Sequence, residues 1–238
     1  MPGASDHNQW PQKKPEAKTM SQHTFHIDIV SDVVCPWCII GYKQLQKTLQ
    51  ATPEVGDVDI RWHPFQLNPH MPPEGQNLRE HLMMKYGSTA EQSIAARQRL
   101  TDLGESLGFS FDYFDDMRMV NTFDAHRLLH WAGLKGRQTE MKLALFTAFF
   151  SHRKDVSNAK VLAATAAEAG LPEDEASLVL EQGTFSDEVN AELEHWLDQG
   201  IHAVPTFIFN NKYQVPGAQD AETFVRVLRK VNQKESVA

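Results

Sequence analysis

Cysteine is scarce in this sequence, and its scarcity excludes a fold held together by disulfides. Only two cysteines occur among 238 residues, Cys35 and Cys38, with Pro36 and Trp37 between them. A protein that depends on disulfides for stability spreads several cysteine pairs along its length. A pair concentrated in one C-x-x-C motif indicates chemistry rather than structural cross-linking.

Long apolar runs and excess positive charge are also missing. The most apolar stretch, residues 144–150, is far shorter than the roughly 20 residues that span a bilayer. The chain has 31 acidic against 23 basic residues, and its formal net charge of -8 repels phosphate backbones. We therefore expect neither a membrane-embedded protein nor a nucleic-acid partner.

Residues 1–22 lack the apolar centre of a secretory signal and are rich in Pro, Gln, Lys and Ser. This composition is typical of a disordered tail. Because no signal is recognisable, the expected location is the cytoplasm.

The segment around the cysteines has the pattern of a strand, a helix and a second strand. Residues 24–30 are β-branched and apolar, residues 36–50 carry apolar side chains at helical spacing, and residues 58–62 follow as a strand. Pro36 stands at the first helical position, where its missing N–H costs nothing. The order predicts a βαβ unit with a right-handed crossover, in which a strand leads directly to Cys35.

A different pattern follows residues 68–75, a Pro-rich stretch that indicates a linker. Helical signals then repeat, starting with a capping-box pattern at residues 88–91 before an amphipathic run that ends near Gly108. Further helices are expected at residues 122–134, 139–150, 158–169 and 185–197.

Strand character returns only near the end of the chain, at residues 206–209 and 213–215, with Asn210 and Asn211 as a hairpin turn. An amphipathic helix closes the sequence. We therefore predict an α/β fold with a large all-helical insertion. Its parts are a disordered tail at 1–22, a discontinuous α/β domain at 23–70 and 185–235, and the insertion at 71–184.

Two thiols separated by two residues at the first turn of a helix lie within reach of a disulfide bond. The unpaired N–H groups and the dipole of the helix start stabilise a thiolate, so we expect Cys35 to attack a disulfide and Cys38 to resolve the intermediate. The alternatives are inert buried thiols or half of a zinc site. Zinc needs two more ligands, and His126 and His130, four residues apart, are more simply one face of a helix.

Four motifs carry a family resemblance that covers about residues 24–235. They are IVSDVVCPWCIIG at 29–41, PFQLNP at 64–69, NTFDAHR at 121–127, and VPTF at 204–207 together with GAQ at 217–219. On these motifs the sequence resembles the thioredoxin-like disulfide oxidoreductases related to bacterial DsbA, specifically the FrnE-like branch. The first and fourth motifs point to the chemistry, and the other two to the branch.

The resemblance implies a thioredoxin-like fold interrupted by the helical insertion. It also implies a cis peptide bond between Val204 and Pro205, facing the cysteines, which lets Val204 pair with an extended substrate. A trans proline that opens a strand is the alternative. The implied partners are disulfide-containing proteins or small thiols, with glutathione as a candidate co-substrate; no metal and no cofactor beyond the redox-active disulfide is implied.

The sequence departs from the family pattern in two respects. Ile29 stands where related enzymes often keep a buried carboxylate, so Asp28 or Asp32 is a candidate proton acceptor, or else an ordinary strand-end or loop residue. The chain has no second cysteine pair, which excludes a relay between two pairs. Trp37 lacks a titrating group and is a candidate apolar contact for substrate.

Two other functions stay open. The 2-hydroxychromene-2-carboxylate isomerases and kappa-class glutathione transferases look similar in layout, but they usually place a serine at the first active-site position, so the intact cysteine pair argues against them. The third hypothesis is a non-catalytic binding module whose cysteines are incidental.

If the insertion lines a substrate groove, Phe123, His126 and Arg127 are candidate substrate contacts, as is Asn68 in the linker. The alternative for the first three is a helix face that packs internally with one solvated arginine. The sequence assigns neither the redox direction nor the oligomeric state.

Overall fold

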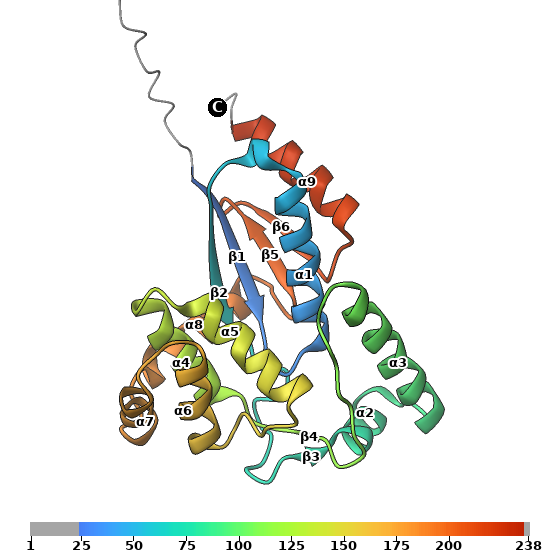
Figure 1. Ribbon diagram of the computed structural model, residues 1–238, viewed down its shortest axis with the longest axis vertical. Helices are drawn as coiled ribbons and strands as arrows, with labels where there is room; N and C mark the ends of the chain where they lie inside the picture. Colours follow the sequence, from blue (N-terminus) through green and yellow to red (C-terminus); the bar gives the residue numbers. More distant parts are fainter. Residues whose placement is uncertain (1–23, 236–238) are drawn as a thin grey trace, which may run out of the picture.

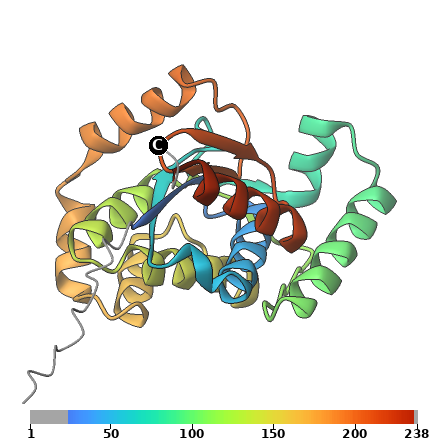
Figure 2. The ribbon, with the colours of Figure 1, turned by 90° about the horizontal axis from the view of Figure 1, so that it is seen from above.

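The computed structural model describes residues 24–235, which form a four-stranded sheet with helices on both faces (Figure 1, Figure 2). The tail predicted at residues 1–22 lies outside this range. The sheet has the order β2-β1-β5-β6, in which β1 runs parallel to β2 and antiparallel to β5. Its strands are Phe25–Ser31 (β1), Val58–Pro64 (β2), Thr206–Phe209 (β5) and Tyr213–Pro216 (β6).

The two faces of the sheet bury alternate side chains. Helices α1 (Pro36–Ala51) and α9 (Ala221–Glu235) pack together on one face, while α8 (Ser186–Asp198) covers the opposite face (Figure 2). Ile29 and Phe207 belong to the main core, whereas their neighbours Val30 and Ile208 belong to a smaller cluster beneath α8. This alternation is the period-two pattern of a strand buried on both faces.

The segment between β2 and α8 is largely helical, as the sequence predicts. Helix α5 continues into a π-helical turn, Thr147–Ser151, and two short strands, Gln76–Asn77 (β3) and Arg118–Met119 (β4), pair within the segment. Figure 1 shows α2 and α3 on one side of the lower end of the sheet, and α4 to α7 on the other. The helices are Leu78–Tyr86 (α2), Ala90–Ser106 (α3), Phe123–Leu134 (α4), Gln138–Phe146 (α5), Ala159–Glu168 (α6) and Glu173–Glu181 (α7).

Three details differ from the sequence-based prediction. The sequence patterns do not predict helices α2 and α7, of nine residues each. The capping box lies one residue later than predicted, because Thr89 and Gln92 exchange the two hydrogen bonds. The α-helix expected to run to residue 150 ends at Phe146, and the π turn begins at Thr147.

Within residues 24–235, no helix combines the length and the apolar character that crossing a bilayer requires.

His63 ties β2 to both β1 and α8. Its Nε2 lies 2.8 Å from Asp28 Oδ1, and its Nδ1 contacts a carboxylate oxygen of Glu192. Burial alone would lower the pKa of this imidazole, but the hydrogen bonds and charges of the two carboxylates raise the pKa of His63 above its ordinary value. When protonated, the side chain is a cation that bridges two carboxylates from different elements.

Replacing His63 with glutamine should destabilise the fold most strongly at acidic pH. A histidine whose pKa is raised by folding contributes stability that is fully present below its unfolded pKa, about 6.5, and that is lost as the pH rises through the folded pKa. We expect the free energy of unfolding in urea to fall by about 2 kcal/mol at about pH 6 and by less at about pH 9. Glu192→Gln removes one of the two carboxylates and should make the stabilisation by His63 depend less on pH. If His63→Gln lowered the free energy of unfolding equally at both pH values, His63 would not carry the assigned charge.

Candidate active site

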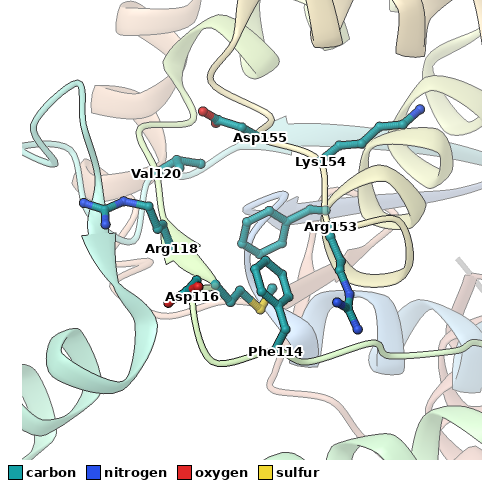
Figure 3. A pocket seen from close by; sticks show the side chains of 9 residues that line it. Phe114, Asp116, Arg118, Val120, Arg153, Lys154 and Asp155 are labelled. Carbon is teal, nitrogen blue, oxygen red and sulfur yellow. The ribbon is translucent and has the colours of Figure 1, made fainter.

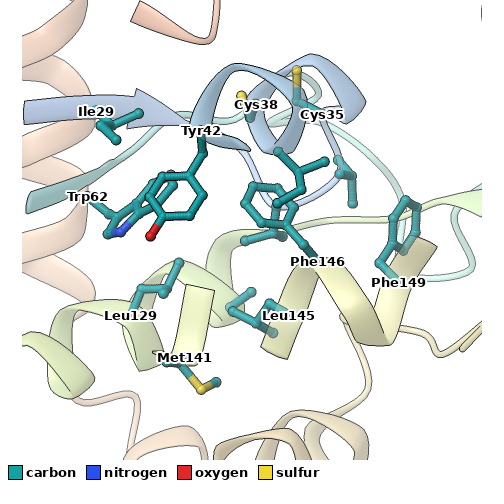
Figure 4. Close-up of a cluster of buried hydrophobic side chains, with 14 of the residues drawn as sticks. Ile29, Cys35, Cys38, Tyr42, Trp62, Leu129, Met141, Leu145, Phe146 and Phe149 are labelled. Atoms are coloured by element: carbon teal, nitrogen blue, oxygen red, sulfur yellow. The ribbon is translucent and has the colours of Figure 1, made fainter. Parts of the chain in front are cut away.

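Cys35 and Cys38 lie at the start of α1, as the sequence predicts. Cys35 is the N-cap residue with an extended backbone, Pro36 takes the first helical position, and the Cys38 N–H donates to the Cys35 carbonyl oxygen at 3.1 Å. Both thiols are free, with 3% of Cys35 and 0% of Cys38 exposed. Figure 4 shows the pair at the first turn of α1, above a layer of buried aromatic side chains. A reagent from solvent therefore meets Cys35 before Cys38.

A second segment meets the cysteines from the start of β5. The Val204–Pro205 peptide bond is cis, which confirms the predicted geometry. The Cys35 thiol donates a weak hydrogen bond to the Val204 carbonyl oxygen, with Sγ 3.7 Å from that oxygen. This contact joins positions that are 169 residues apart in the chain. The Val204 backbone therefore lies beside the sulfur that would react with a substrate.

Asp32 provides a buried carboxylate near the cysteines, although Ile29 occupies the position where related enzymes often keep one. The Asp32 side chain is almost fully buried, its Oδ2 accepts the Leu67 N–H at 2.8 Å, and its Oδ1 lies 3.4 Å from His126 Nε2. Burial opposes ionisation, but the His126 ring, the Leu67 N–H and the Lys142 charge hold the pKa of Asp32 below its ordinary value. Of the two aspartates considered from the sequence, Asp32 is the one beside the cysteine loop, because the Cys35 N–H donates to its carbonyl oxygen.

Lys142, on α5, is a site residue that the sequence analysis missed. Its side chain is fully buried, its Nζ lies 3.4 Å from the Ser31 carbonyl oxygen, and it faces the rings of Trp62 and Phe146 at 5.4 and 5.2 Å. Burial lowers the pKa of Lys142 to about 8, against the pull of negative charge on Cys38, Asp32 and Cys35. The available signal was a single cation in an otherwise apolar stretch from Met141 to Phe146.

These surroundings give the two thiols different roles. Burial raises the pKa of Cys38 well above that of a free thiol, and a hydrogen bond and negative charge from Cys35 raise it further. The charge of Lys142 acts in the opposite direction. Cys38 is therefore held as a thiol at neutral pH, and Lys142 is the nearby cation that favours its ionisation when it must react.

The predicted residues around the cysteines line one cavity of about 430 Å³, formed by the cysteine loop, the linker, α2, α3 and the π turn. Trp37, 45% exposed, stands at this cavity, and Asn68 and Val204 contribute to its lining. The structure thus brings together Cys35, Pro36, Trp37, Val204 and Asn68.

Phe123, His126 and Arg127 do not line this cavity. Phe123 borders a separate surface hollow beside Gln66. His126 is 2% exposed and its Nε2–H donates to the Phe65 carbonyl oxygen at 3.0 Å. Arg127 is 3% exposed, and its guanidinium donates to the Thr184 carbonyl oxygen and to Asp124. Burial favours internal packing for His126 and Arg127, with the arginine enclosed rather than solvated.

Another hollow, of about 180 Å³, lies on the far side of Met117 and Phe149 and contains neither cysteine (Figure 3). Its two arginines already have partners, since Arg153 pairs with Asp112 and Arg118 donates to the Glu74 carbonyl oxygen. In the described part of the chain, no group of three or more His, Cys, Asp or Glu side chains is placed to hold a metal ion.

Comparison with known proteins agrees with this geometry. The family model described as the DsbA-like thioredoxin domain matches residues 26–229. The protein YwbO of Bacillus subtilis is 26% identical over 213 residues, which cover 89% of this chain and 100% of YwbO.

Two solved structures are similar in fold. A probable DsbA oxidoreductase from Streptomyces coelicolor is 32% identical, with a TM-score of 0.82 over 87% of this chain and 89% of that one. A 2-hydroxychromene-2-carboxylate isomerase is 11% identical, with a TM-score of 0.63 over 90% of this chain and 99% of that one. The second likeness concerns the fold alone.

Removing the Lys142 charge should make Cys38 harder to ionise. In a Cys35→Ala background, Cys38 is the only thiol, and Lys142→Met should slow its alkylation by iodoacetamide several-fold at about pH 8. The deficit should shrink as the pH rises, because the thiolate then forms without help. Lys135→Met, which removes an exposed lysine, serves as the matched control. Equal rates for the two lysine variants would show that Lys142 does not act on Cys38.

Proposed function

This chain belongs to the family of DsbA-like thioredoxin domains, and from that membership and the site geometry we propose that it is a thiol-disulfide oxidoreductase working through Cys35 and Cys38. The observation that carries the proposal is the arrangement of the pair. Cys35 lines a cavity and contacts the Val204 backbone, while Cys38 lies fully buried one helical turn behind it.

The reaction follows from these positions. The Cys35 thiolate attacks a substrate disulfide, one substrate sulfur leaves as a thiolate that takes up a proton, and Cys35 is left in a mixed disulfide. Cys38 then loses its proton and attacks the Cys35 sulfur, which forms the Cys35–Cys38 disulfide and releases the second substrate thiol. Two electrons pass from the enzyme dithiol to the substrate, and the reverse sequence oxidises a substrate dithiol.

The buried charges serve the second step. Lys142 lies beneath the loop that carries the cysteines and favours the Cys38 thiolate, which burial otherwise disfavours. Asp32 and His126 keep this region polar although it is closed to solvent. We also propose that the protein is a member of the FrnE-like branch and acts in the cytoplasm. Glutathione is the proposed co-substrate.

A glutathione-dependent isomerase is the competing function, and the fold does not discriminate between the two. The residue at the first active-site position discriminates between the two functions. Cys35, with the Cys38 thiol behind it, can form and release a mixed disulfide. An isomerase needs no resolving thiol. The intact pair therefore favours the redox reaction.

Single-cysteine variants test the two roles. Cys38→Ala should accumulate a stable mixed disulfide through Cys35 when the reduced protein is mixed with insulin, because no thiol remains to resolve it. Cys35→Ala should trap about tenfold less, since Cys38 has no exposed surface. Mass spectrometry of non-reduced samples measures both adducts.

The double variant Cys35→Ala/Cys38→Ala gives the background for that experiment. If either single variant kept full insulin-reducing or RNase-refolding activity, the dithiol mechanism would be wrong.

The residue between the cysteines should tune the redox direction. Trp37 offers no charge to a Cys35 thiolate, so Trp37→His should stabilise the reduced form and make the couple more oxidising by about 30 mV, a tenfold change in the equilibrium with glutathione. Equilibration in glutathione buffers, read by trapping the free thiols, gives the potential of both proteins. A lower potential for Trp37→His would contradict the assigned role of the intervening residue.

A further inference from the structure

The cavity beside Cys35 has the features of a built ligand site. Its volume of about 430 Å³ lies in the range of small-molecule pockets. Most of its wall is apolar, with Leu78 from α2, Leu100 from α3 and Phe150 from the π turn among the lining residues. Figure 4 places Phe149, another wall residue, on the same side of the buried core as Cys35. An occupant must therefore present an apolar body.

Two hydroxyl groups in this wall lack hydrogen-bond partners. Ser93, on α3, is 2% exposed, and neither its Oγ nor the buried hydroxyl of Tyr113 has a partner within the described residues. Both side chains line the cavity. A buried hydroxyl without a partner costs free energy, and native proteins seldom tolerate it unless a ligand or water completes the bond. Two of them at one cavity indicate an occupant with hydrogen-bond acceptors.

A cation stands beside these hydroxyls. Arg97 lies one helical turn after Ser93, donates through Nε to the Ser93 carbonyl oxygen, and lines the same cavity. In residues 24–235, no carboxylate forms an ion pair with Arg97. Arg97 and Tyr113 line the same cavity as Cys35. One small molecule in this cavity can therefore reach both the polar groups and the reactive sulfur.

On these observations we infer that the cavity binds a small thiol or disulfide with an apolar body and a carboxylate, the carboxylate being held by Arg97, Ser93 and Tyr113. This inference rests on the proposed function and adds the substrate class. Guanidinium and hydroxyl groups donate to a carboxylate in charge-assisted hydrogen bonds, while the apolar wall receives the rest of the molecule. The bound sulfur then lies against Cys35, and the exchange proceeds by the steps already given.

A pair of aromatic disulfides tests the inference. Dithiobis(nitrobenzoate) carries a carboxylate on each ring, and dithiodipyridine is an aromatic disulfide without one. The rate constant for the pre-reduced enzyme is measured with each reagent from the absorbance of the released thiol, so no recycling partner is needed. Arg97→Met should lower the rate constant for dithiobis(nitrobenzoate) about tenfold and that for dithiodipyridine less than about twofold.

Arg99→Met is the matched control, because it removes the same charge from an exposed position on the same helix. It should leave both rate constants within about twofold of the unsubstituted protein. Equal losses for Arg97→Met and Arg99→Met, or equal losses with both disulfides, would overturn the inference.

The hydroxyl variants separate a binding role from a structural one. Ser93→Ala and Tyr113→Phe each remove an unpartnered hydroxyl, so the melting temperature should stay unchanged or rise. The rate constant for dithiobis(nitrobenzoate) should nevertheless fall about threefold or more in each variant. A lower melting temperature with an unchanged rate constant would mean that the hydroxyls serve the fold, which would also overturn the inference.

The same assay distinguishes failure of the substrate class from failure of the proposed function. If Cys35→Ala reacted with dithiodipyridine as fast as the unsubstituted protein, the proposed dithiol chemistry would be wrong. If Cys35 proved essential but the Arg97, Ser93 and Tyr113 variants did not discriminate between the two disulfides, only the carboxylate site would be wrong.

Discussion

The antiparallel pairing of β1 with β5 brings together two segments that lie far apart in the chain. β1 runs directly into the cysteine loop, and β5 begins directly after Pro205. Because Val30 pairs with Thr206, the ends of these strands place Cys35 against the Val204 carbonyl oxygen. The cavity, the buried charges and the insertion are all arranged around this junction, so the register between the two strands determines the geometry of the site.

The buried region behind the cysteines contains ionisable groups of opposite charge rather than only apolar side chains. Asp32, His126 and Lys142 are all fully or almost fully buried, which is costly unless each has a partner. The N–H of Leu67 and the carbonyl oxygens of Phe65 and Ser31 provide those partners, and the negative charge of Asp32 opposes the positive charge of Lys142. The insertion therefore does more than cover the sheet, because α4 and α5 supply two of the three ionisable groups.

Local sequence patterns were sufficient for the parts of the site that have local causes. The C-x-x-C pair with Pro36 predicts a helix start, and the family resemblance predicts the cis Val204–Pro205 bond; both are confirmed. Lys142 could not be placed in this way, because a lysine on a helix is usually solvated and only the packing of α5 against β2 encloses it. The hydroxyls of Ser93 and Tyr113 were equally hidden, since their significance depends on a cavity between elements. Helix α7, which follows Pro172 and begins with three acidic residues, carries a short polar pattern that is easily taken for a loop.

The π turn at Thr147–Ser151 has a consequence for how this fold tolerates change in length. Phe149 and Phe150 are adjacent in sequence, and both are buried, at 4% and 2% exposure. The wider turn holds one residue more than an α-helical turn, which is how a single additional residue is accommodated inside a helix. Deleting one residue here would restore regular helical spacing and rotate one of the two rings out of the wall. The length of this turn therefore sets which aromatic rings face the cavity, in addition to the identity of its residues.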